Sequence, residues 1–153
     1  MEKNNLIISS MTLNDLEDIK DFLISDFDDF WNYETLKDEL NSSFSKYIIV
    51  KNSITNSIVG FAGIKVILDE ADLMNIVTKK DSRNNGIGSL LLKSIINKCK
   101  EENLKYLNLE VNVNNTIAIN LYKKYNFEEI GLRKKYYNNT DDALLMKLNL
   151  LNF

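Results

Sequence analysis

The feature that most constrains this chain is a glycine-bearing turn between a short apolar run and the clearest helix of the sequence. The run Leu73–Thr78 predicts a strand, and the loop Lys79–Asn85 follows it. A helix then begins near Gly86, because apolar residues recur behind it at helical spacing. These apolar residues are Leu92, Ile95, Ile96 and Cys99. A strand that turns on glycine into an amphipathic helix predicts an architecture of helices packed on a sheet.

The remaining elements surround this unit in a regular order. Thr12 and Asn32 are expected to cap two helices near the N-terminus, and Asp69-Glu70 is expected to form a turn. Further strands are expected at Leu6–Ser10, Tyr47–Lys51, Ile58–Ile67, Tyr106–Val113, Phe127–Tyr137 and Ala143–Asn149, with a helix at Asn115–Tyr125. The order β-α-α-β-β-β-α-β-α-β-β predicts a mixed sheet with helices on its faces, in the α/β to α+β range. The sequence shows no linker, repeat or low-complexity block, so one domain, 1–153, is expected.

Composition excludes several classes of protein. The chain of 153 residues is 44% apolar and 27% charged, which is typical of a folded globular domain. It has no histidine and one cysteine, Cys99, so a disulfide within the chain, the usual zinc sites and a Cys–His nucleophile are excluded. A net charge of -3 argues against a protein that coats nucleic acid. No targeting signal or membrane span is expected, and the cysteine usage favours the cytoplasm.

The turn Arg83–Gly88 is a candidate anion site. It could present backbone N–H groups to a phosphate, with the dipole of the following helix behind them. Gly86 and Gly88 would let the backbone approach the ligand closely. The turn matches neither the P-loop nor the Rossmann pattern. A glycine-rich start of a helix without any ligand is the other interpretation.

A second group of candidate residues lies on the strand and helix that follow this unit. Glu110 lies in the alternating run Tyr106–Val113, whose leucines and valines point to one side, so its carboxylate points to the other. Tyr122 lies about two turns into the helix that follows. A solvated carboxylate and a core tyrosine are the ordinary interpretations of these residues.

These two groups together resemble the GNAT family of N-acetyltransferases. The turn is similar to the family's Arg/Gln-x-x-Gly-x-Gly/Ala motif, and Leu109-Glu110-Val111 with the following Asn-x-x-Ala and Leu-Tyr segments is similar to its second motif. Asn126 stands where glycine is usual, and asparagine also tolerates a left-handed backbone. The resemblance runs from about Ile58 to Leu148, with Trp31 as the main anchor before it. Within the family the chain is similar to the RimI type, which acetylates the alanine N-terminus of a ribosomal protein. Three further segments carry that finer resemblance: Leu68–Ala71, Arg133–Tyr137 and Asp142–Met146.

The resemblance implies a fold, a donor and roles for residues. The fold is a mixed, mostly antiparallel sheet of about seven strands with helices on both faces. Acetyl-CoA is the acetyl donor, no metal takes part, Glu110 is the general base and Tyr122 is the general acid. The acceptor is a protein N-terminal peptide, with no nucleic acid or membrane partner, and the oligomeric state is left open. The residues implied to bind acetyl-CoA are Ile76, Val77, Thr78, Arg83, Asn84, Asn85, Gly86, Ile87, Gly88, Ser89 and Asn115.

The chemistry of the acceptor agrees with a carboxylate base. An α-amine has a pKa near 7.8 and a lysine near 10.4, so deprotonating the lysine costs about 3.5 kcal/mol more. A glutamate that acts through water is a weak base and therefore suits an α-amine. Two alternatives stay open: a GNAT enzyme that acetylates a small amine, such as a polyamine, amino sugar or antibiotic, and a non-catalytic module that binds acyl-CoA.

Overall fold

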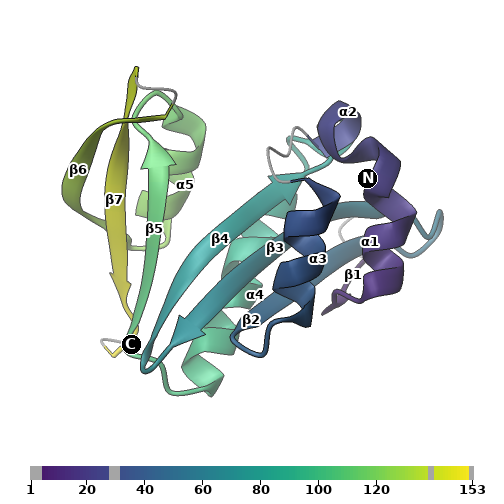
Figure 1. Cartoon of the computed structure of the whole chain (residues 1–153), viewed down its shortest axis with the longest axis horizontal. Helices are drawn as coiled ribbons and strands as arrows, with labels where there is room; N and C mark the ends of the chain where they lie inside the picture. Colours follow the sequence, from purple (N-terminus) through teal and green to yellow (C-terminus); the bar gives the residue numbers. More distant parts are fainter. Residues whose placement is uncertain (1–4, 28–31, 138–139, 152–153) are drawn as a thin grey trace. The chain divides into compact units, whose positions relative to one another are not determined.

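The computed structural model describes residues 5–27, 32–137 and 140–151 (Figure 1). Its elements follow the predicted order with one addition, because a 3-10 turn at Lys20–Phe22 divides the first predicted helix and a separate short helix follows at Leu23–Phe27. The strands are β1 (Leu6–Ser10), β2 (Ser45–Asn52), β3 (Ile58–Ile67), β4 (Glu70–Thr78), β5 (Tyr106–Asn112), β6 (Glu128–Tyr137) and β7 (Asp141–Asn149). The helices are α1 (Leu13–Ile19), α2 (Leu23–Phe27), α3 (Tyr33–Asn41), α4 (Ile87–Glu101) and α5 (Thr116–Lys124), with 3-10 turns η2 (Lys20–Phe22) and η3 (Lys80–Ser82). Trp31 lies outside the described residues.

The strands form a seven-stranded mixed sheet in the order β1-β2-β3-β4-β5-β7-β6. β2 pairs antiparallel with β1 and β3, and β7 pairs antiparallel with β5 and β6. β4 and β5 are parallel, and their paired residues are Glu70–Asp72 and Tyr106–Asn108. The sheet is therefore mostly antiparallel, as expected for the fold.

Local sequence signals set most of the boundaries. The Thr12 hydroxyl accepts a hydrogen bond from the N–H of Asp15, whose carboxylate accepts one from the N–H of Thr12, so a capping box begins α1. Asn32 caps α3 through its Oδ1, which accepts a 2.9 Å hydrogen bond from the N–H of Thr35. The turn before β4 differs from the prediction. It lies at Leu68–Asp69, where Leu68 has φ 56°, so Glu70 is the first residue of the strand and not part of the turn.

The chain divides into two compact units. The first unit comprises residues 1–66 and 74–95. Its sheet has helices on both faces. Neighbouring residues of β3 point to opposite faces, so they contact different helices. Phe61 belongs to a core cluster with residues of α1, α2 and α3, whereas Gly60 lies against Ile87 and Leu91 of α4. Figure 1 shows α1 and α3 on one side of β2 and β3 and α4 on the other.

In the first unit, the ring of Tyr47 fills the space that a side chain at Gly63 would need. Tyr47 of β2 lies directly opposite Gly63 of β3, and a Cβ at Gly63 would lie only 2.1–2.3 Å from three carbons of the Tyr47 ring. The Tyr47 hydroxyl donates a 3.0 Å hydrogen bond to Oδ1 of Asn75 in β4, in a buried setting. The ring therefore spans β3 and ties β2 to β4, one residue before Ile76.

The second unit comprises residues 67–73 and 96–153 and has two unlike faces. Alternate residues of β5 and β7 are buried and apolar on one face: Leu107, Leu109, Val111, Leu144, Met146 and Leu148. The opposite face carries Asn108, Glu110 and Asn112 of β5. This alternation confirms the prediction that Glu110 points away from the apolar side of its strand.

No helix within the described ranges is long and apolar enough to cross a membrane.

Candidate functional site

The predicted phosphate turn of the first unit has the backbone of an anion-binding loop. Asn84 has φ 66° and Gly86 has φ 76°, so two left-handed residues flank Asn85 just before α4 begins. Left-handed residues in a turn make successive N–H groups converge, and the first N–H groups of a helix have no intrahelical partner. The sequence places asparagine and glycine at these positions, two residue types that adopt positive φ at low cost.

Side chains of the turn hold this conformation. The Asn85 amide donates hydrogen bonds to the carbonyl oxygens of Ser82, at 3.0 Å, and Arg83, at 3.1 Å. Ile87 is fully buried and anchors the start of α4, while Gly88 and Ser89 are half-buried. Arg83 is exposed. The turn is thus stabilised by its own hydrogen bonds, and the outward-facing part of its backbone stays accessible.

The strand that precedes the turn supplies the other predicted residues of the first unit. Ile76, Val77 and Thr78 are half-buried at the end of β4, and Val77 also packs against the core cluster. Asn75, directly before them, is buried and holds the Tyr47 hydroxyl. The end of β4 is therefore fixed on its core side by a polar bond that the sequence analysis did not identify.

Glu110, in the second unit, presents a partly exposed carboxylate from β5. Its side chain is 31% exposed, and its Oε1 lies 3.1 Å from Nη2 of Arg133 in β6. β7 lies between the two strands, with Leu145 opposite Glu110 and Ala143 opposite Arg133. A carboxylate in this position can accept a proton from a group that approaches the polar face.

Tyr122 has a different environment on α5. It is only 5% exposed, and its ring centre lies 5.6 Å from that of Phe127. Asn126 between them has φ 72°, which confirms that asparagine takes the left-handed position at which glycine is usual. The ring of Tyr122 is thus held by packing, which matches the core interpretation and leaves the role of its hydroxyl a prediction.

Asn115 has a structural task in this fold. It is the N-cap of α5, and its Oδ1 accepts a 3.2 Å hydrogen bond from the N–H of Ala118. Its predicted contact with acetyl-CoA remains a prediction.

The acidic residues near the turns of the second unit already have partners. Asp69 lies 3.1 Å from Lys105 and raises the pKa of that lysine by accepting its hydrogen bond. Glu70 lies 3.6 Å from Lys147, and Asp141 accepts a 3.0 Å hydrogen bond from the Asn112 amide. The two lysines offset the charges of Asp69 and Glu70, whereas the neutral amide of Asn112 leaves the charge of Asp141 in place.

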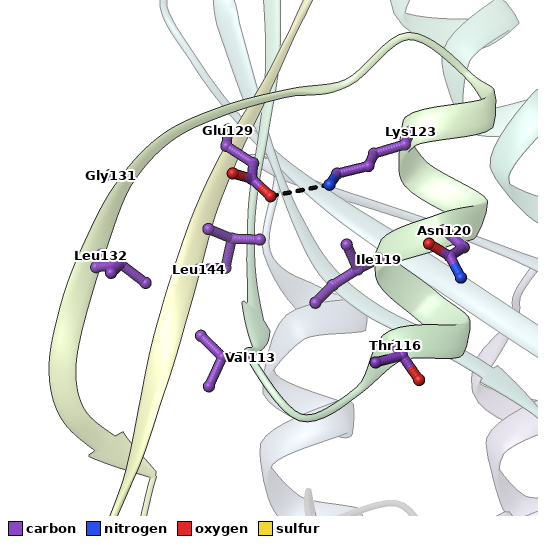
Figure 2. A pocket seen from close by; sticks show the side chains of 9 residues that line it. All are labelled: Val113, Thr116, Ile119, Asn120, Lys123, Glu129, Gly131, Leu132 and Leu144. Atoms are coloured by element: carbon purple, nitrogen blue, oxygen red, sulfur yellow. Dashed lines mark ion pairs between the residues drawn. The ribbon is translucent and has the colours of Figure 1, made fainter.

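A pocket of about 730 Å³ opens between α5 and β6 in the second unit (Figure 2). Val113, Ile119, Leu132 and Leu144 form its apolar part, and the ion pair between Lys123 and Glu129 spans it at 3.0 Å. None of the predicted site residues lines this pocket. The hollow belongs to the apolar face of the strands, whereas Glu110 lies on the polar face.

Two contacts of the site were missed by sequence reasoning. The sequence indicates Arg133 only as part of Arg133–Tyr137, a segment that carries the family resemblance. Its contact with Glu110 depends on the strand order β5-β7-β6. The Tyr47–Asn75 bond depends on the pairing of β2 with β3. No periodic pattern in the sequence predicts either contact. Within the described part of the chain, no group of three or more histidine, cysteine or acidic residues could hold a metal ion.

Comparisons with known proteins agree with this fold. A model described as the acetyltransferase (GNAT) family matches residues 16–127. A Bacillus subtilis protein named as a candidate ribosomal protein bS18-alanine N-acetyltransferase is 32% identical over 146 residues, which span 94% of this chain and 95% of that protein. The ribosomal protein bS18-alanine N-acetyltransferase of Haemophilus influenzae is 38% identical over 107 residues, or 70% of each chain. The crystal structure of the ribosomal-protein-S18-alanine N-acetyltransferase from Escherichia coli superposes with a TM-score of 0.86 and 28% identity, covering 95% of this chain and 94% of that one.

Proposed function

This chain belongs to the GNAT family of acetyltransferases, and from that premise we propose that it acetylates the N-terminal α-amine of an alanine-starting ribosomal protein of the small subunit. The observation that supports this acceptor is the match, over 94–95% of both chains, with relatives named for that reaction. We further propose that the whole chain acts as one domain, in the cytoplasm where ribosomal proteins are made.

The proposed reaction is direct transfer from acetyl-CoA, which supplies the acetyl group as a thioester. The amine nitrogen forms a bond to the acetyl carbon, the carbon–sulfur bond breaks, and CoA leaves as the thiol. The neutral amine reacts: Glu110 takes, through a water molecule, the proton that the nitrogen loses and releases it to solvent, from which Tyr122 recovers the proton that it gives to the sulfur. The exposed carboxylate of Glu110 on the polar face of β5 supports its role.

In the proposed reaction, Tyr122 supplies the proton that the leaving sulfur takes up. A thiol has a pKa near 8.5 and a tyrosine near 10, so full proton donation before the bond breaks is uphill by about 2 kcal/mol. A hydrogen bond that strengthens as charge develops on the sulfur is sufficient. The packing of the Tyr122 ring against Phe127 supports this role, because a ring held in place positions its hydroxyl before the reaction.

The turn of the first unit is proposed to hold the pyrophosphate of acetyl-CoA. Gly88→Val should weaken acetyl-CoA binding at least about tenfold, because a branched side chain blocks the close approach of the helix backbone to phosphate. Isothermal titration with acetyl-CoA measures the affinity, and circular dichroism checks the fold. Unchanged affinity in a folded Gly88→Val variant would place the phosphate site elsewhere.

The acceptor is tested by thiol-release kinetics with acetyl-CoA. A basic peptide that begins with alanine should be acetylated faster than the same peptide beginning with leucine, because the amine must reach the thioester carbon past a small first side chain. The N-blocked peptide and free lysine should be poor acceptors. Added salt should lower kcat/KM, because it screens the attraction between the acidic enzyme and the basic peptide over about 8–10 Å. Faster turnover of spermidine than of the alanine peptide would favour the small-amine enzyme instead.

A further inference from the structure

The carboxylate of Glu110 already has a cationic partner in this structure. Arg133 of β6 reaches across β7 to place Nη2 3.1 Å from Glu110 Oε1. Its guanidinium carbon also lies 4.9 Å from the centre of the Tyr136 ring. An arginine within about 6 Å of an aromatic face is attracted to it. These two contacts fix the direction of the Arg133 side chain.

A local irregularity of β6 accompanies these contacts. The register between β6 and β7 shifts between Arg133 and Tyr137, and Lys135 has φ 52°. The Lys135 N–H donates a 2.8 Å hydrogen bond to Oδ1 of Asp142 in β7. A positive φ at lysine persists only where its surroundings hold it, and irregularities of this kind redirect side chains. The Asp142 carboxylate therefore stabilises the bend beside Arg133.

We propose that Arg133 occupies, in the free enzyme, the place on Glu110 that the terminal ammonium of the acceptor takes. This inference rests on the proposed function, since it assumes an α-amine acceptor near Glu110. Most α-amines are protonated at neutral pH, because their pKa is near 7.8. The acceptor thus arrives as a cation that seeks the same carboxylate. Arg133 is a positioning residue that holds Glu110 until the ammonium replaces it.

The exposure of the pair makes this exchange feasible. The Arg133 side chain is 53% exposed and that of Glu110 is 31% exposed, so water reaches both. Ion pairs in such a setting are weak, and an incoming cation can replace one partner. While it stays in place, Arg133 competes with the ammonium for the carboxylate. Removal of the guanidinium should therefore strengthen acceptor binding, which a purely structural role would not do.

Titration calorimetry with the CoA-bound enzyme tests this competition. The probe is the basic peptide that begins with alanine, at low salt, in its free-amine and N-acetylated forms. Arg133→Gln should bind the free-amine peptide about two- to fivefold tighter than the parent enzyme. Its affinity for the N-acetylated peptide should stay unchanged, because that peptide carries no ammonium. Arg133→Lys keeps the charge and should bind both peptides within about twofold of the parent.

Lys123→Gln is the matched control, because Lys123 forms a similar ion pair with Glu129 at 3.0 Å, at the pocket on the apolar face of the strands. Its peptide affinity should equal that of the parent. The inference fails if Arg133→Gln binds the free-amine peptide no tighter, or if both peptides gain equally, which indicates general charge repulsion. Parallel kinetics separate the two proposals: no acetyl transfer to the peptide rejects the proposed function, whereas transfer with an unchanged Kd rejects only the exchange.

Discussion

Replacing Tyr122 with phenylalanine is expected to lower kcat for acetyl transfer about 100-fold, within the range typical of a lost general acid. Acetyl-CoA affinity should change by less than about twofold, because the hydroxyl acts mainly as charge develops on the leaving sulfur. The substitution keeps the ring that packs 5.6 Å from Phe127, so the fold should persist. Steady-state kinetics and calorimetric titration with acetyl-CoA measure the two effects separately.

Tyr106→Phe is the matched control for this change. Tyr106 also lies in the second unit, where its ring lies 4.4 Å from the Lys147 ammonium and its hydroxyl has no proposed role. The phenylalanine variant keeps the ring face and should retain kcat within about twofold. A wild-type kcat in Tyr122→Phe, with a normal control, would remove Tyr122 from the chemistry and leave the packing interpretation.

The order of the elements could be predicted because each of them depends on neighbours in the sequence. In α1 and α3, the capping side chain and the N–H group that donates a hydrogen bond to it are three residues apart. The alternation of β5 is visible within seven residues, so the outward direction of Glu110 follows from it. The positive φ of Asn84 and Gly86 likewise follows from residue type. Local signals thus predict both candidate groups of the site.

The contacts that surround these groups depend on strands far apart in the chain. Glu110 and Arg133 meet because β7 inserts between β5 and β6, although β7 follows both in the sequence. The turn before β4 was predicted one residue late, because Asp69 and Glu70 are both acceptable turn residues while pairing with β5 begins at Glu70. Strand order and pairing arise from the whole fold, and single-sequence periodicity does not contain them.

Gly63→Ala is expected to be the most destabilising small substitution in the first unit. A Cβ at Gly63 would lie 2.1–2.3 Å from Cζ, Cε2 and Cε1 of Tyr47, so the ring must move. The ring cannot move freely, because it is 5% exposed within the core cluster and its hydroxyl is bonded to buried Asn75. Overpacking combined with a lost buried hydrogen bond should cost about 3 kcal/mol of unfolding free energy.

Thermal unfolding measures this cost directly. For a chain of this length the expected fall in Tm is roughly 6–12 °C. Gly131→Ala is the matched control, because a Cβ there would meet only Leu145 Cδ1, at an ordinary 3.5 Å. Its Tm should change by less than about 2 °C. Equal Tm values for the two variants would show that Tyr47 shifts at little cost. A large fall confined to Gly63→Ala would establish that the ring and Asn75 hold the end of β4, directly before the residues proposed to lie along acetyl-CoA.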